Sequence, residues 1–133
     1  MAFLSANILI CETVLTEKTD VLSAIRMMDT IKIAPGNNSV HFYSMTRVSS
    51  MPGDFDPHVL KVQVTHQNGT LITEAPEHRF QYGYRMDLGG PGGFILTTEF
   101  TIGIETLPLP AGCLVTANLD GKSVARMPFM LRR

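Results

Sequence analysis

The stretch that decides the fold class is Cys113–Arg133, which reads CLVTANLDGKSVARMPFMLRR. Small and apolar residues recur at every second position on both sides of Asp120-Gly121. A period of two is typical of β-strands, and a Gly-containing turn between two such runs is typical of a β-hairpin. The stretch therefore predicts two antiparallel strands joined by a tight turn.

The register of this hairpin depends on the length of its loop. A two-residue loop would place Val115 opposite Arg126, an apolar side chain opposite a charged one. A three-residue loop over 119–121 places Val115 opposite Ala125 instead. Because a slip of one residue moves every side chain to the opposite face, we expect the three-residue loop. Gly121 would then occupy the left-handed bulge position, which glycine fills without steric cost.

The remainder of the chain repeats this alternation between turn signals. Leu60, Val62 and Val64 alternate with polar residues, and Asn68-Gly69 follows as a turn. About eight such strands can be counted, and no strong helix interrupts them. This pattern predicts an antiparallel β-sandwich, immunoglobulin-like or related.

Segment 21–33 is open to two interpretations. Val21, Ile25 and Ile33 suit a strand, whereas the spacing of other apolar residues after a possible cap at Asp20 suits a helix. The β-branched content of the segment favours the strand.

Size and composition limit the classes of protein that the chain can represent. A length of 133 residues predicts one domain, 1–133, with a core that needs no metal or disulfide. The low share of charged residues, 17%, suggests an apolar surface patch and hence self-association. The net charge of −1 gives no electrostatic reason to expect nucleic acid or an anionic membrane as a partner.

The N-terminus and the cysteines bear on location. Residues 1–11 are apolar but lack the basic region and cleavage site of a signal peptide, and no run approaches the length of a membrane span. We therefore expect a cytoplasmic protein. Cys11 and Cys113 both fall within strand patterns, and in that compartment buried free thiols are expected rather than a disulfide.

The chain resembles a family of small bacterial all-β proteins of unknown function. The resemblance is carried by short segments at both ends of the chain: Ile10-Cys11-Glu12, Leu22-Ser23-Ala24-Ile25, Asp29-Thr30-Ile31, Leu119-Asp120-Gly121 and Met127-Pro128-Phe129. It implies no activity, and it favours the strand interpretation of segment 21–33.

Asp54, Asp56 and His58 form the best metal-like cluster of the sequence. Two carboxylates and an imidazole in one loop could ligate a divalent cation. Asp and Pro57 also simply form turns, and the loop lacks the length and the closing glutamate of an EF-hand. We favour the turn, and we expect no cofactor.

Phe80, Tyr82 and Tyr84, with Arg85 beside them, form the best candidate for ligand binding. Aromatic side chains on one face of a strand could stack on a sugar or a base. The same alternation is also expected of side chains that line the core, and we favour the core.

Catalytic motifs are missing from the sequence. There is no Gly-x-Ser-x-Gly, no His-Glu-x-x-His and no Cys-x-x-Cys. We therefore expect no enzyme but a non-enzymatic binding or assembly module, a homo-oligomer or a partner of another protein, without nucleic acid or membrane. The two alternatives are a small-ligand or carbohydrate-binding protein using Phe80–Tyr84, and a metal-dependent enzyme using the 54–58 loop.

Overall fold

The computed structural model describes residues 3–18, 21–50, 56–81 and 92–133, and these contain strands but no helix. The strands are β1 (Phe3–Lys18), β2 (Val21–Met27), β3 (Thr30–Lys32), β4 (Ser39–Ser50), β5 (Pro57–His66), β6 (Leu71–Glu74), β7 (His78–Gln81), β8 (Gly92–Gly103), β9 (Ala111–Leu119) and β10 (Lys122–Arg132). The predicted all-β fold is confirmed. Across the described ranges, no helix is long and apolar enough to cross a membrane.

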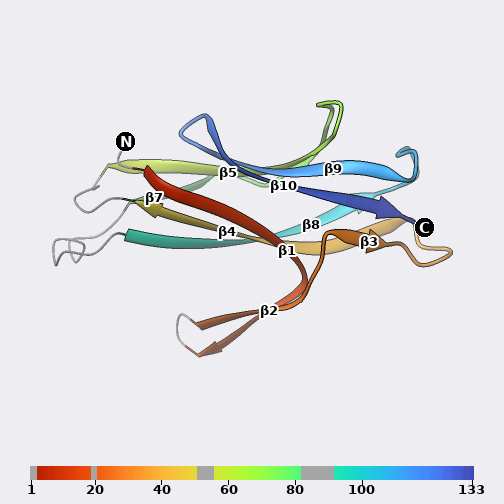
Figure 1. Ribbon diagram of the computed structural model, residues 1–133, viewed down its shortest axis with the longest axis horizontal. Coiled ribbons are helices and arrows are strands. Elements are labelled where there is room, and N and C mark those ends of the chain that lie inside the picture. The colour runs from red at the N-terminus through yellow and green to blue at the C-terminus, as the bar shows by residue number, and fades with distance from the viewer. Residues whose placement is uncertain (1–2, 19–20, 51–55, 82–91) are drawn as a thin grey trace.

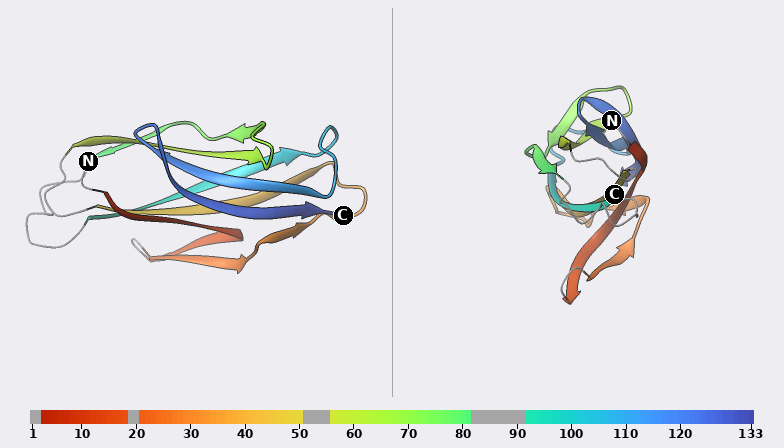
Figure 2. Two further views of the ribbon diagram at one scale, coloured as in Figure 1. Left: turned by 45° about the horizontal axis from the view of Figure 1, so that its top comes forward. Right: turned by 90° about the vertical axis from the view of Figure 1, so that its left-hand side faces the viewer.

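The strands form two sheets that lie face to face (Figure 1). The four-stranded sheet has the order β2-β1-β4-β8. The six-stranded sheet has the order β3-β10-β9-β5-β6, and β7 pairs with β5. The expectation of purely antiparallel strands is wrong at one edge, because β3 runs parallel to β10. Figure 2 shows the far ends of β1 and β2 extending away from the two-layered body.

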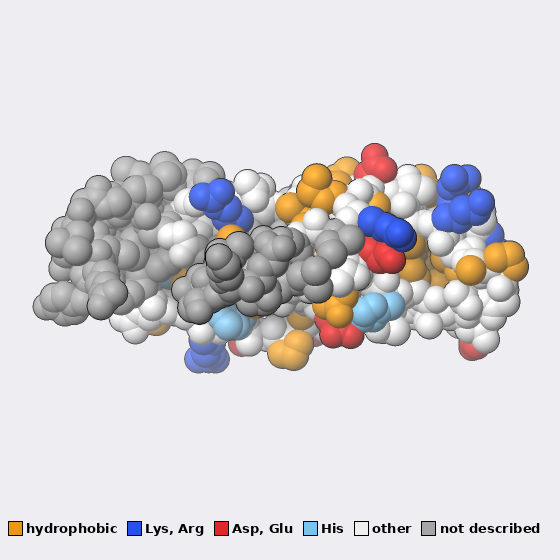
Figure 3. Space-filling model, turned by 90° about the horizontal axis from the view of Figure 1, so that it is seen from below, with side chains coloured by type: hydrophobic (Ala, Val, Ile, Leu, Met, Phe, Trp, Pro, Cys, Tyr) orange, Lys and Arg blue, Asp and Glu red, His pale blue; other side chains and the backbone are white. Residues whose placement is uncertain are grey.

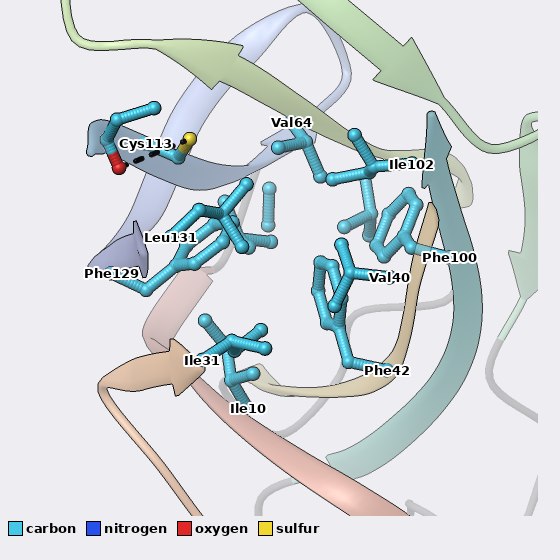
Figure 4. Close-up of a cluster of buried hydrophobic side chains, with 14 of the residues drawn as sticks. Ile10, Ile31, Val40, Phe42, Val64, Phe100, Ile102, Cys113, Phe129 and Leu131 are labelled. Atoms are coloured by element: carbon cyan, nitrogen blue, oxygen red, sulfur yellow. Dashed lines mark hydrogen bonds between the residues drawn. The ribbon is translucent and has the colours of Figure 1, made fainter. Parts of the chain in front are cut away.

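The core lies between the two sheets because each central strand turns alternate side chains inward. Leu60, Val62 and Val64 of β5 are fully buried, as their alternation predicts. Phe42 of β4 joins the layers: its ring centroid lies 5.5 Å from that of Phe100 on β8 and 5.3 Å from that of Phe129 on β10 (Figure 4). The inward faces of both sheets thus share one hydrophobic cluster.

Segment 21–33 is extended, as the sequence predicts, but it is not one strand. It forms β2, which pairs with β1, and β3, which pairs with β10 in the other sheet. The break falls at Met28-Asp29, where the chain crosses between the layers. Crossing lets Ile31 and Ile33 enter the shared core.

The register predicted for the final hairpin is wrong. Leu119 pairs with Lys122 around a two-residue turn in which Asp120 and Gly121 have φ values of 51° and 83°. A bulge between Ser123 and Ala125 then shifts the register, so that Val115 pairs with Met127. A two-residue turn alone would point the core side chains of β10 outward. The extra residue in the bulge returns them to the inward side of the sheet.

Cys11 and Cys113 are free and buried, as predicted. Burial raises the pKa of both thiols, which keeps them in the unreactive protonated form. A thiol reagent is expected to modify neither cysteine rapidly in the native protein and both within the dead time in denaturant. Rapid labelling of native protein, followed by mass spectrometry, would contradict the buried placement.

Candidate functional site

The start of β5 is fastened to the β9–β10 turn by Asp120. One carboxylate oxygen, Oδ2, lies 2.7 Å from Nδ1 of His58, and the other, Oδ1, accepts a hydrogen bond of 2.9 Å from the backbone amide of Val59. The Asp120 amide donates in return to the Val59 carbonyl at 2.9 Å. We call these three contacts the Asp120 clasp. Since an ionised carboxylate only accepts, Nδ1 of His58 carries the proton in this pair.

The surroundings of Asp120 favour its ionised form. Partial burial alone would raise the pKa of the carboxyl, but the hydrogen bonds from the Val59 amide and from His58, with the charge of His58, outweigh it. The pKa of Asp120 is therefore held below its ordinary value. The His58 side chain is only 3% exposed, so its imidazole is not open to a substrate as a general base would be. The Asp120 clasp therefore stabilises the fold.

The structure describes two of the three residues of the metal-like loop, Asp56 and His58. Asp56 is exposed before β5, His58 turns into the protein towards Asp120, and Asp54 lies outside the described residues. Within the described ranges, no group of three or more His, Cys, Asp or Glu side chains is arranged to hold a metal ion.

The predicted ligand strand is described only at its first residue. Phe80 on β7 is partly buried against the core, and its ring centroid lies 5.4 Å from that of His58 and 6.4 Å from that of His78. Tyr82, Tyr84 and Arg85 lie outside the described residues. The structure therefore brings Phe80 and His58 together, although the sequence assigns them to two different sites.

The side of the six-stranded sheet that faces away from the core carries most of the cations of that sheet, and we call it the outer face. Its cations are Lys32, Lys61, Arg79, Arg126 and Arg132. Two of them are neutralised locally: Nζ of Lys61 lies 3.0 Å from Glu74, and Nη2 of Arg79 lies 3.8 Å from Glu77.

Three cations of the outer face, Lys32, Arg126 and Arg132, form no ion pair with any described residue. Lys32 and Arg132 are direct partners across β3 and β10, so their charges lie side by side. Nε of Arg126 donates to the Ser123 hydroxyl at 3.2 Å, a neutral contact that leaves the positive charge available.

The bulge in β10 is what places Arg126 on the outer face. Arg126 pairs with Thr116, whose neighbours Val115 and Ala117 point into the core. Without the extra residue, Arg126 would pair with Val115 and point inward. Sequence reasoning missed this face because it read the charge of the chain as a total.

The opposite side of the molecule differs in charge. Viewed from the side of β2, cationic, acidic and histidine side chains are interspersed (Figure 3). Arg26 pairs with Glu12 at 3.0 Å, and Nε2 of His41 lies 2.6 Å from Glu99. Arg47, on the outward side of β4, is exposed and forms no ion pair within the described part of the chain.

Comparison with known proteins adds one likeness. No model of a protein family matches the chain, and no curated protein sequence matches it. The fold is similar to part of the Pseudomonas fluorescens alkylpurine DNA glycosylase AlkC bound to DNA containing an abasic site analog, with a TM-score of 0.50 and 11% sequence identity. The likeness covers 97% of this chain and 31% of that chain, so this chain spans about a third of the glycosylase.

This likeness corrects three expectations drawn from the sequence. A non-enzymatic binding or assembly module, the absence of an enzyme, and a homo-oligomer or protein partner without nucleic acid were all expected. The similar structure is an enzyme solved with DNA bound to it, so these expectations are wrong where they exclude an enzyme and nucleic acid. The physical cause of the error is that a net charge near zero hides the grouping of Lys32, Arg126 and Arg132 on one face.

Proposed function

We propose that this chain is an immunoglobulin-like β-sandwich that binds DNA through its outer face, as one part of a DNA-acting enzyme. The likeness to a DNA glycosylase supports the class. The proposal is carried by Lys32, Arg126 and Arg132, which form no ion pair with any described residue. Lys and Arg are the residues that bind DNA phosphates, and they do so whatever the sequence of bases.

The strand order supports the immunoglobulin-like arrangement. In such domains a C-F-G sheet packs on an A-B-E-D sheet. Here β5, β9 and β10 are neighbours in the order expected of C, F and G, and β1, β4 and β8 are neighbours in the order of A, B and E. The chain lacks the usual tryptophan, and its two cysteines are free, so no disulfide between them joins the layers.

The neutral side chains of the outer face suit contact with a sugar-phosphate backbone. Hydroxyl and amide groups surround the cations: Thr30, Gln63, Thr65 and Asn118. Such groups, with Lys and Arg, make most hydrogen bonds to DNA phosphates. Because the described part of this face carries no aromatic side chain, phosphate contacts rather than stacking are expected to dominate duplex binding.

Binding of duplex DNA is expected to weaken steeply with salt. Three phosphate contacts give a slope of about −2.7 for log K against log [salt], which is a loss of about 40-fold between 50 and 200 mM salt. Fluorescence anisotropy with a short labelled duplex measures the slope. No detectable binding at low salt, or binding that is independent of salt, would contradict the proposed function.

A further inference from the structure

A shallow groove crosses the outer face between its two arginines. Its volume is about 510 Å³, and its floor includes Leu114 of β9 with Pro128 and Met130 of β10. Met130 is 39% exposed, and together with Leu114 and Pro128 it forms an apolar patch among the polar side chains of this face. An apolar floor within a cationic polar face therefore needs an explanation that phosphate binding alone does not provide.

The position of the groove relative to the charges is fixed by the strand. Arg126 and Arg132 are six residues apart on β10 and point to the same side, which separates their backbones by roughly 20 Å. Pro128 and Met130 lie between them on that side. Lys32 stands beside Arg132 at the far end. Cationic side chains thus lie on both sides of the apolar floor of the groove.

The edge of the groove is polar. Gln67 and Asp29 line it, and Oε1 of Gln67 lies only 2.4 Å from where a Cβ on Gly112 would stand. The Gln67 amide therefore packs directly on the Gly112 backbone, into space that a larger residue would remove. Its amide and the Asp29 carboxylate offer both donors and acceptors at the edge of the apolar floor.

We propose that this groove holds one unpaired base of single-stranded DNA, and that phosphates further along the strand on either side of that base lie on Arg126 and on the Arg132–Lys32 pair. A base has an apolar face and a polar edge, which match the floor and the Gln67–Asp29 edge of the groove. In a duplex the face is covered by stacking, so only an unpaired base can reach the floor. The inference rests on the proposed function and names its preferred substrate.

The test compares three DNA probes on the intact chain: a short homothymidine strand, the same strand with its central bases replaced by abasic sugars, and a duplex of equal length. The first probe is expected to bind about tenfold more tightly than either of the others. A difference of this size lies in the lower part of the range found for the stacking of one base on a protein. Salt dependence should be similar for the two single strands, because their phosphates are the same.

Two variants locate the effect. Met130→Ala trims the floor, and Gly112→Ala displaces the flexible end of Gln67; both leave every cation in place. Each is expected to remove most of the tenfold difference between the normal and abasic strands. The matched control is Met27→Ala, which trims a methionine that is 68% exposed on the other sheet and should change nothing. Circular dichroism verifies that each variant folds.

Failure of this inference is distinguishable from failure of the proposed function. Equal affinity for normal and abasic strands, or tighter binding of the duplex, overturns the base site and leaves salt-dependent DNA binding intact. No binding of any probe overturns both. Loss of the base-dependent difference in Met27→Ala as well as in Met130→Ala also overturns the assignment to the groove.

Discussion

Replacing Asp120 with alanine is expected to lower the free energy of unfolding by about 2–3 kcal/mol. The change removes the carboxylate oxygen of Asp120 that accepts from Nδ1 of the buried His58 imidazole, and the loss of one partner of a buried hydrogen bond costs about 1–3 kcal/mol. Alanine carries a Cβ at φ 51° as aspartate does, so the backbone strain remains, and the acceptor for the Val59 amide is lost as well. Urea denaturation followed by circular dichroism measures the loss.

Two further substitutions at Asp120 separate these causes. Asp120→Gly removes the strain at positive φ but also the side chain, so it isolates the loss of the hydrogen bonds. Asp120→Asn can still accept from the Val59 amide and tolerates positive φ, but its NH2 group replaces Oδ2, so it removes both the charge and the acceptor for Nδ1 of His58. The order of stability expected is wild type, then asparagine, then glycine, then alanine. Equal stability of all four proteins would show that the clasp contributes nothing.

The Asp120 clasp also predicts how stability depends on pH. Because the native pKa of Asp120 lies below its ordinary value of 3.8, the clasp contributes stability above that pH and loses it as the pH falls through the lowered native pKa. The difference in stability between wild type and Asp120→Asn should therefore be largest near neutral pH and should shrink below pH 3.8. A difference that stays constant on acidification would exclude the charge as its source.

Reversing both arginines of the outer face, Arg126→Glu with Arg132→Glu, is expected to reduce affinity for duplex DNA at least 100-fold at low salt. Two phosphate contacts are lost and two repulsive charges are added, so the salt slope should flatten by about two. Both side chains are exposed and lie outside the core, so the fold should be retained.

The matched control is Arg26→Glu with Arg47→Glu on the four-stranded sheet. It changes the net charge by the same amount, and both residues are exposed. Affinity for DNA should fall far less in this control than in the outer-face variant. If the two double variants lose affinity equally, net charge governs binding, and the outer face is not the DNA-binding surface.

The sequence by itself determined the all-β class and most of the core. Leu60, Val62 and Val64 alternate with polar residues, and each is fully buried, because a strand turns successive side chains to opposite faces. The extended nature of 21–33 and the free state of both cysteines followed from equally local signals. A period of two can be recognised in the sequence of one strand without knowing its partner strand, so these features could be predicted without a structure.

Only the tertiary structure decided where the charges and the polar contacts lie. His58 and Asp120 are 62 residues apart in the chain, and nothing near either one indicates the other. The bulge beside Ser123 sets the register in which Arg126 pairs with Thr116 and faces outward, and pairing between β3 and β10 brings Lys32 beside Arg132. Side-chain partners and faces depend on register between distant strands, and register is set by packing against the opposite sheet rather than by the local pattern.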